Sequence, residues 1–225
     1  ANKSCAYAAG WIDGLASGKN LGRGVVYFAD HAEASDGGLN YPHRNTRNVP
    51  FFAPSGLLNR WSIRLHNHLL FSRAKTGEQL VDLDRYFYPL DRIRNWNRLY
   101  GRRGFIQYQF CLPEAFAFAG IREILQTIQK SKDLPFLSVI KRHGDRPPEA
   151  VHSFPERGYS LALDFPRTDT VFALVRRLDE IVWQYEGKIY LAKDACSAGR
   201  MGRVDPATFG YEKFYSLLKG RILNT

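Results

Sequence analysis

Residues 104–130 read GFIQYQFCLPEAFAFAGIREILQTIQK and predict a strand that is followed directly by a helix. In the strand, large apolar residues at every second position alternate with Gln107 and Gln109, which is typical of a strand with one buried face. Pro113 opens the helix, because proline is tolerated in the first helical turn. We therefore expect the apolar side of the strand to pack under the helix and the two glutamines to face away from it.

Further strands and a second helix complete a six-element unit. Strands are predicted at 136–143, 158–165 and 188–193, and a helix at 169–186 that ends at Gly187. The order between 104 and 193 is therefore strand–helix–strand–strand–helix–strand, the split βαβ or ferredoxin-like arrangement. We predict an α+β fold in which an antiparallel sheet carries its helices on one face.

The chain outside this unit is less regular, and its elements are predicted from shorter patterns. Glycine, asparagine, proline and arginine dominate the long predicted loop at 36–54. The predicted elements are short strands at 4–9 and 25–29, a helix at 55–71 capped by Ser55, a strand at 80–88, a helix at 91–100 stopped by Gly101, and a last helix at 205–218.

Composition excludes several classes of protein. With 44% hydrophobic residues, the 225-residue chain can bury a core, and no apolar run is long enough to cross a membrane. Its three cysteines are far apart, so a disulfide framework or zinc ribbon is not expected and a reducing compartment is. The chain begins with Ala1, and its single methionine is Met201, so we expect a piece of a longer product.

Polar residues share one face of the predicted sheet, because alternation places them opposite the large apolar side chains. The polar positions are Gln107, Gln109, Ser160 and Asp164, while Lys141 and Lys193 lie in the other two strands of the unit. Neutral donors and acceptors beside lysines suit a polyhydroxylated ligand that carries a phosphate. The alternative is an ordinary solvent-facing surface, although glutamine and serine are weak strand formers.

A net charge of +10 predicts attraction to an anion, which leaves nucleic acid, a phosphorylated substrate or a membrane surface open. The string at 103–110 partly matches an RNA-recognition motif, so a stand-alone basic ferredoxin-like module that binds RNA or another anionic ligand is an alternative. Ile106 and Gln107 depart from that motif, which also belongs on the third strand of such a unit. No metal site is predicted, since His66 and His68 point in different directions on a helix.

Several segments together resemble the C-terminal half of the decaprenylphosphoryl-ribose oxidase family, flavin-linked oxidoreductases of the vanillyl-alcohol-oxidase superfamily. These segments are WIDGLASGKNLGRGVV (11–26), FYPLDRIRNWNRLYGRRGFIQYQFCLP (87–113), FLSVIKRHG (136–144), SFPERGYSLALDFP (153–166), GKIYLAKD (187–194) and RVDP (203–206).

The resemblance implies an FAD-dependent oxidoreductase that oxidises a sugar-like or other alcohol by hydride transfer to flavin. Residues 1–190 would form the substrate-binding or cap domain, and 191–225 a C-terminal tail that packs on an N-terminal FAD-binding domain absent from this chain. The fragment alone is expected to be inactive. Its expected partners are that FAD domain, a sugar-like or polyprenyl-phosphate-linked substrate and an electron acceptor, without nucleic acid. The expected location is the cytoplasm, with at most peripheral contact with the inner membrane.

The resemblance also assigns individual residues. Lys193 corresponds to the family's catalytic lysine, which lies beside flavin and substrate and so counts as cofactor-binding too. The substrate-binding positions are Gln107, Gln109, Lys141, Ser160 and Asp164 in the pocket, and Trp11 near its entrance. Ala162, His143 and Phe87 differ from the residues that mycobacterial members carry, which leaves the exact substrate open.

Overall fold

The computed structural model describes residues 5–33, 46–54, 56–145 and 154–193. The predicted last helix, Ser55 and the tail from residue 194 lie outside the described residues, as does most of the predicted long loop.

The predicted six-element unit is present in the predicted order. Its strands pair antiparallel in the order β6-β7-β5-β8, which places the first and third strands of the unit side by side at its centre. The elements are β5 (Phe105–Pro113), α3 (Glu114–Lys130), β6 (Leu137–His143), β7 (Gly158–Pro166), α4 (Val171–Gln184) and β8 (Lys188–Ile189).

Two N-terminal strands extend this sheet to six strands. β1 (Tyr7–Ile12) pairs with β6, and β2 (Gly24–Ala29) pairs with β1, so the full order is β2-β1-β6-β7-β5-β8. The α+β class and the antiparallel sheet are therefore confirmed.

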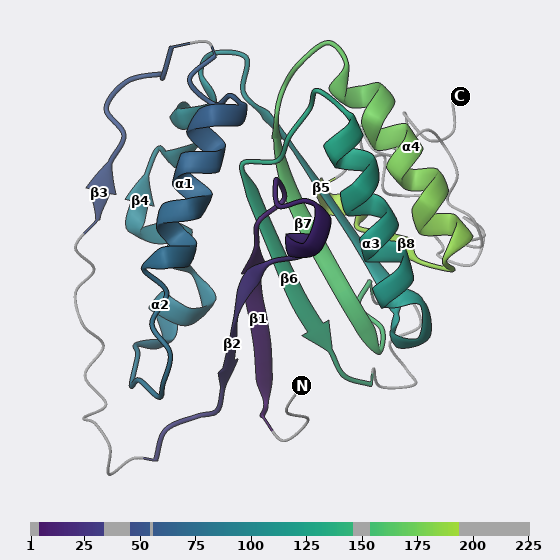
Figure 1. Cartoon of the computed structure of the whole chain (residues 1–225). Coiled ribbons are helices and arrows are strands. Elements are labelled where there is room, and N and C mark those ends of the chain that lie inside the picture. Colours follow the sequence, from purple (N-terminus) through teal and green to yellow (C-terminus); the bar gives the residue numbers. More distant parts are fainter. Residues whose placement is uncertain (1–4, 34–45, 55, 146–153, 194–225) are drawn as a thin grey trace, which may run out of the picture.

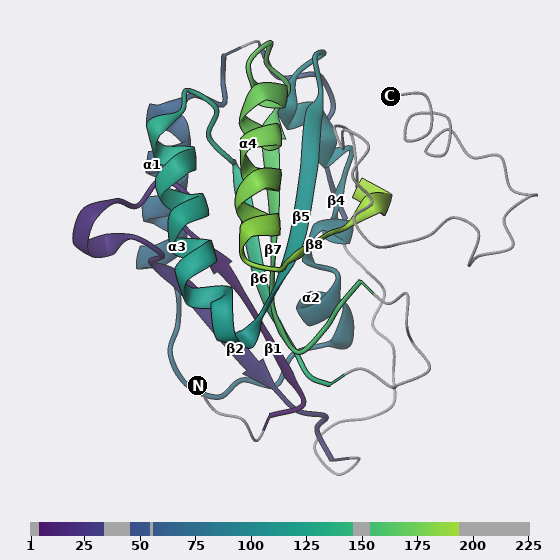
Figure 2. The same cartoon turned by 90° about the vertical axis from the view of Figure 1, so that its right-hand side faces the viewer.

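Helices α3 and α4 lie together on one face of the sheet, here called the helix face (Figures 1 and 2). The alternating apolar residues of β5 and β7 are buried beneath them, as the sequence predicted. These core residues are Ile106, Tyr108, Phe110, Leu161, Leu163 and Phe165. Tyr108 also donates a hydrogen bond of 2.8 Å to Asp179 on α4, so its hydroxyl is satisfied within the core.

The segment 46–100 covers part of the opposite face (Figures 1 and 2). Its elements are β3 (Arg47–Asn48), α1 (Arg60–Ser72), α2 (Leu83–Phe87), the 3₁₀ helices η3 (Pro89–Arg92) and η4 (Trp96–Tyr100), and β4 (Ile93–Arg94). Polar and aromatic contacts join it to the sheet. Asn67 on α1 donates a hydrogen bond of 2.7 Å to the buried Asp13, and Tyr100 stacks on Phe105 with ring centroids 4.5 Å apart.

Three predictions for this segment differ from the structure, and in the first two a local capping interaction determines where the helix begins. The predicted strand at 80–88 contains α2, whose first turn is capped by Asp82 accepting from the backbone N–H of Arg85 at 2.7 Å. The helix predicted from residue 55 begins at Arg60, where the Asn59 side chain and Ser62 form a capping box. The helix predicted at 91–100 is divided, since Asn95 has a left-handed φ of 55°.

The C-terminal edge of the sheet differs from its prediction in length. β8 has two residues instead of six, and the 3₁₀ helix η5 (Leu191–Lys193) follows it. At the end of α4 the left-handed residue is Glu186, with a φ of 56°, and not Gly187. Gly187 is required for space, because a Cβ there would lie 2.8 Å from the carbonyl oxygen of Cys111.

Candidate functional site

The strand register brings the predicted polar residues to one face of the sheet. Gln107 lies opposite Asp164, and Lys141 lies opposite Ser160. Directly opposed residues of antiparallel strands point to the same side, and these positions alternate with the core residues. The sheet therefore has a second surface, here called the polar face, that faces away from α3 and α4 and includes Gln109.

Trp11 and His143 also belong to the polar face, although the sequence left the direction of His143 open. Trp11 on β1 lies opposite Val139, which in turn lies opposite Ala162 at the centre of the sheet. His143 lies opposite Gly158, and its Nε2 is 2.7 Å from the hydroxyl oxygen of the buried Ser160. Burial and the nearby charge of Lys141 both lower the pKa of His143, so its neutral form is favoured.

Lys193 reaches the same region from the edge of the sheet. Beyond the two residues of β8, the backbone N–H of Tyr190 still donates to the carbonyl oxygen of Gln109 at 2.8 Å. The turn η5 then brings Lys193 near Asp164, whose pKa the lysine charge lowers. All seven predicted site residues are thus brought to one face from four different strands and one turn.

Asp164 is the buried carboxyl group of this face, with 4% of its surface exposed. Its Oδ1 accepts a hydrogen bond of 3.1 Å from the side-chain amide of Gln107. Burial raises the pKa of Asp164 to about 6, although the Gln107 hydrogen bond and the charge of Lys193 act in the opposite direction. A carboxyl group with this pKa can exchange a proton with a ligand near neutral pH.

Tyr100 lies beside the Asp164 carboxyl group, and the sequence analysis did not single it out. It ends η4, is 7% exposed, and lies close enough to Asp164 that the carboxylate and burial together raise the pKa of the phenol. Among the described residues, neither the Tyr100 hydroxyl nor Asp164 Oδ2 has a hydrogen-bond partner. The sequence signal was GRRG at 101–104, which is typical of a turn. In the structure Gly101 and Gly104 both have positive φ, and the turn folds Tyr100 back over β5.

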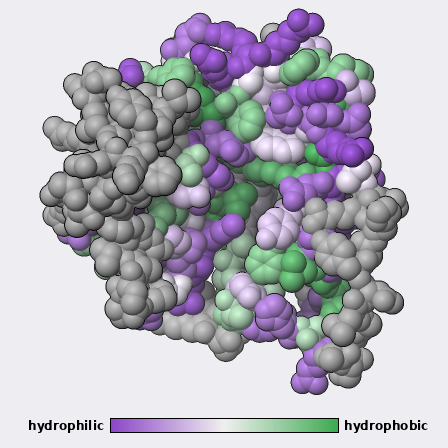
Figure 3. Space-filling model, turned by 180° about the vertical axis from the view of Figure 1, so that it is seen from behind, coloured by the Kyte–Doolittle hydropathy of each residue, from purple (hydrophilic) through white to green (hydrophobic). Residues whose placement is uncertain are grey.

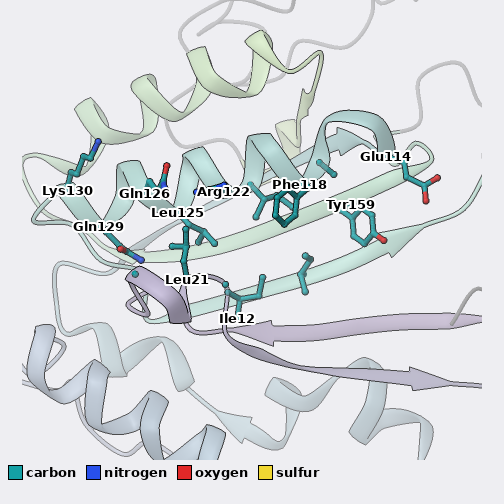
Figure 4. Close-up of a pocket in the computed structure, with 15 residues that line it drawn as sticks. Ile12, Leu21, Glu114, Phe118, Arg122, Leu125, Gln126, Gln129, Lys130 and Tyr159 are labelled. Atoms are coloured by element: carbon teal, nitrogen blue, oxygen red, sulfur yellow. The ribbon is translucent and has the colours of Figure 1, made fainter. Parts of the chain in front are cut away.

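Hollows occur on more than one side of the molecule. From behind, a hollow near the middle has hydrophilic residues around it and hydrophobic residues deeper inside (Figure 3). A separate groove of about 1270 Å³ lies beside α3 on the helix face, between Phe118 and Arg122 of that helix and Ile12 of β1 (Figure 4). None of the seven predicted site residues lines this groove, so the groove and the polar face are distinct surfaces.

The structure also bears on RNA binding, on metal binding and on a membrane span. Tyr108 and Phe110, which suggested RNA binding, are 4% and 0% exposed beneath the helices and are not available to stack on bases. In the described ranges, no three His, Cys, Asp or Glu side chains are grouped in a way that could hold a metal ion. The helices in those ranges include none that is long and apolar enough to span a bilayer.

Comparison with known proteins supports the predicted resemblance. The chain is 30% identical, over 197 residues, to decaprenylphosphoryl-β-D-ribose oxidase from Mycolicibacterium smegmatis. The match covers 84% of this chain and 42% of that oxidase, so the chain spans less than half the length of the relative it matches. Models of protein families gave no match to this sequence. The predicted similarity to a part of an FAD-linked oxidase is confirmed over most of the chain.

Proposed function

We propose that this chain, which is similar to a part of an FAD-linked oxidase, is the substrate-binding part of an FAD-dependent oxidoreductase that oxidises a sugar-like alcohol. Residues 1–190 would form the cap over the substrate, and the tail from 191 would pack on the FAD-binding part. The relative is named for a phosphoryl-linked ribose, and we extend that substrate class, a sugar joined to a prenyl phosphate, to this chain.

The observation that carries the proposal is the gathering of the seven predicted residues, the buried Asp164 among them, on the polar face. Gln107 and Gln109 each offer a donor and an acceptor, as vicinal hydroxyl groups require. Lys141 and Lys193 supply two positive charges on this face, and they suit a phosphate.

The polar face also fits the flavin. Lys193 lies near Asp164 at the edge of this face, where its ammonium group can bind an anionic or carbonyl group of the cofactor. Lys193 would hold such a group of the flavin. It would also orient the substrate hydroxyl between its own ammonium group and Asp164. FAD, when bound, accepts the hydride from the alcohol carbon. Lys193 would stabilise the negative charge that develops on the alcohol oxygen as its proton passes to the Asp164 carboxylate, whose pKa is about 6.

The first test concerns Lys193. In the FAD-loaded protein that contains this chain, we expect Lys193→Ala to slow flavin reduction by about 10²-fold or more. The probe is farnesylphosphoryl-β-D-ribose, which keeps the sugar and the phosphate and shortens the prenyl chain. Stopped-flow absorbance under anaerobic conditions measures the rate.

Lys188→Ala is the matched control. Lys188 lies only five residues away, but its ammonium group is 2.7 Å from Glu156 in an ion pair. We expect this variant to reduce flavin at the unsubstituted rate. Equal rates for Lys193→Ala and the unsubstituted protein would refute the role proposed for Lys193.

A further inference from the structure

We propose that Tyr100 is a further substrate-binding residue, whose hydroxyl group acts together with Asp164 Oδ2 to hold one hydroxyl group of the ligand. This inference rests on the proposed function and adds a residue that neither the sequence patterns nor the resemblance assigned.

The first argument is that both atoms are buried and unsatisfied within the described part of the chain. Tyr100 is 7% exposed and Asp164 4% exposed, yet neither the phenol oxygen nor Oδ2 has a hydrogen-bond partner there. Buried polar groups in proteins are nearly always paired, and an unpaired group destabilises the fold. Groups that are kept in this state are typical of sites where a ligand supplies the partner.

The second argument is that the two side chains are held in place by others. Tyr100 stacks on Phe105 at 4.5 Å and contacts Phe136 edge-on at 5.8 Å, so its ring is fixed from two sides. Asp164 is held through Oδ1 by Gln107, which leaves Oδ2 free to accept from a ligand. Preorganised groups bind a ligand without the entropic cost of ordering.

The third argument concerns the chemistry of the group that would bind. An alcohol hydroxyl can accept from the phenol O–H and donate to the carboxylate oxygen at the same time. A phosphate or carbonyl oxygen only accepts, so it would leave Oδ2 unsatisfied and would be repelled by the carboxylate. The pair therefore selects a hydroxyl group, while the phosphate is left to the lysines.

Tyr108 provides a matched comparison on the other side of the same sheet. It is 4% exposed, and its hydroxyl donates to Asp179 at 2.8 Å. Removing a satisfied buried hydroxyl destabilises a protein, whereas removing an unsatisfied one does not. We expect Tyr108→Phe to lower the thermal midpoint and Tyr100→Phe to leave it unchanged or raise it.

Binding is measured in the same FAD-loaded protein with farnesylphosphoryl-β-D-ribose and its monodeoxy analogues. The dependence of the flavin-reduction rate on the concentration of the full probe gives its dissociation constant, and inhibition of that reduction gives the dissociation constant of each analogue. We expect Tyr100→Phe to weaken binding of the full probe by about tenfold or more, because the bound hydroxyl loses a donor. For one monodeoxy analogue the same substitution should have no effect, since that analogue lacks the hydroxyl in question.

The outcomes separate the inference from the proposed function. Equal affinity of Tyr100→Phe and the unsubstituted protein for every probe would overturn the inference and leave the proposed function standing. A loss of stability in Tyr100→Phe as large as in Tyr108→Phe, with unchanged affinity, would show a structural role and overturn it as well. If the unsubstituted protein neither binds nor oxidises the sugar probe, the proposed function fails and the inference fails with it.

Discussion

Asp164 shows how the position of a side chain in a sheet can change its pKa. It lies opposite Gln107 on β5 and Leu137 on β6, so an amide and an apolar side chain replace the water that would otherwise surround it. The loss of water outweighs the stabilising charge of Lys193, and the pKa rises to about 6.

This position predicts a pH dependence of stability. The pKa of Asp164 is raised from 3.8 to about 6 in the folded state, so folding favours the protonated form. The contribution of this group to stability is complete below about pH 4 and is lost as the pH rises through 6. The side chain in Asp164→Asn cannot ionise, so this variant does not lose stability in that pH range.

We expect Asp164→Asn to have nearly the stability of the unsubstituted protein at pH 4 and to exceed it by up to about 3 kcal/mol at pH 8. Urea unfolding at a series of pH values measures the difference, and the values at pH 4 serve as the internal reference. A difference that stays constant between pH 4 and pH 8 would contradict the prediction.

At the level of residues, the sequence predicted which strand side chains share the polar face. It did not predict which residue from outside the strands joins them. Alternation along β5 and β7 was sufficient for Gln107, Gln109, Ser160 and Asp164, because a strand has only two sides. Tyr100 was not identified, since it lies in a 3₁₀ helix and the turn at 101–104 indicates only that the chain reverses there. No periodicity within η4 indicates which side chain will lie over the sheet.

Among the elements, the junction of β5, α3 and β7 is the most tightly constrained. Gly158 begins β7 opposite Pro113, and a Cβ there would lie 2.0 Å from the carbonyl oxygen of Leu112. That atom belongs to the backbone of the neighbouring strand and is fixed by the sheet. Ser160 lies two residues further along β7, and its hydroxyl oxygen is 2.7 Å from Nε2 of His143. The close pairing at Gly158 therefore also helps to position Ser160.

We therefore expect Gly158→Ala to lower the free energy of unfolding by about 3 kcal/mol or more, because the strand must separate from β5. Gly144→Ala is the control, since a Cβ at this nearby glycine meets no atom within 4 Å. Denaturant unfolding of both variants measures the effect. If both variants have the same stability, β7 can shift and the constraint is not real.

Long periodic elements were the ones predicted correctly, and short capped ones were not. Helices α3 and α4 and strands β5, β6 and β7 lie where the patterns place them, because each buries an apolar stripe. The prediction failed at 80–88, where Leu80, Val81 and Leu83 are exposed and their spacing therefore carries no information about a core. There the hydrogen bond that the Asp82 side chain accepts from the backbone N–H of Arg85 determines where the helix begins.

On the scale of the whole molecule, the described part of segment 46–100 contributes only Ile63 to the fully buried core cluster and is otherwise joined to the sheet through polar and aromatic contacts. Asn67 is 1% exposed and donates to Asp13, which also accepts from the backbone N–H of Leu15 and pairs with Arg23. The core beneath α3 and α4 is larger and apolar. The two sides of the sheet should therefore open with different free energies.

We expect Asn67→Ala to speed hydrogen exchange of the α1 amides by about tenfold or more, since Asp13 loses a buried donor, and to leave the α3 amides unchanged. His68→Ala, an exposed neighbour on the same helix, is the control. Hydrogen exchange followed by mass spectrometry distinguishes the two helices. Equal acceleration in α1 and α3 would mean that the molecule opens as one unit.

The alternation of polar-face and core residues along β5 and β7 also limits how this protein can evolve. Inserting or deleting one residue in either strand would turn Gln107 or Asp164 into the core and expose Tyr108 or Leu163 in its place. Descendants can therefore acquire new substrates by exchanging single side chains on these strands, whereas changes in length are confined to the loops that join them.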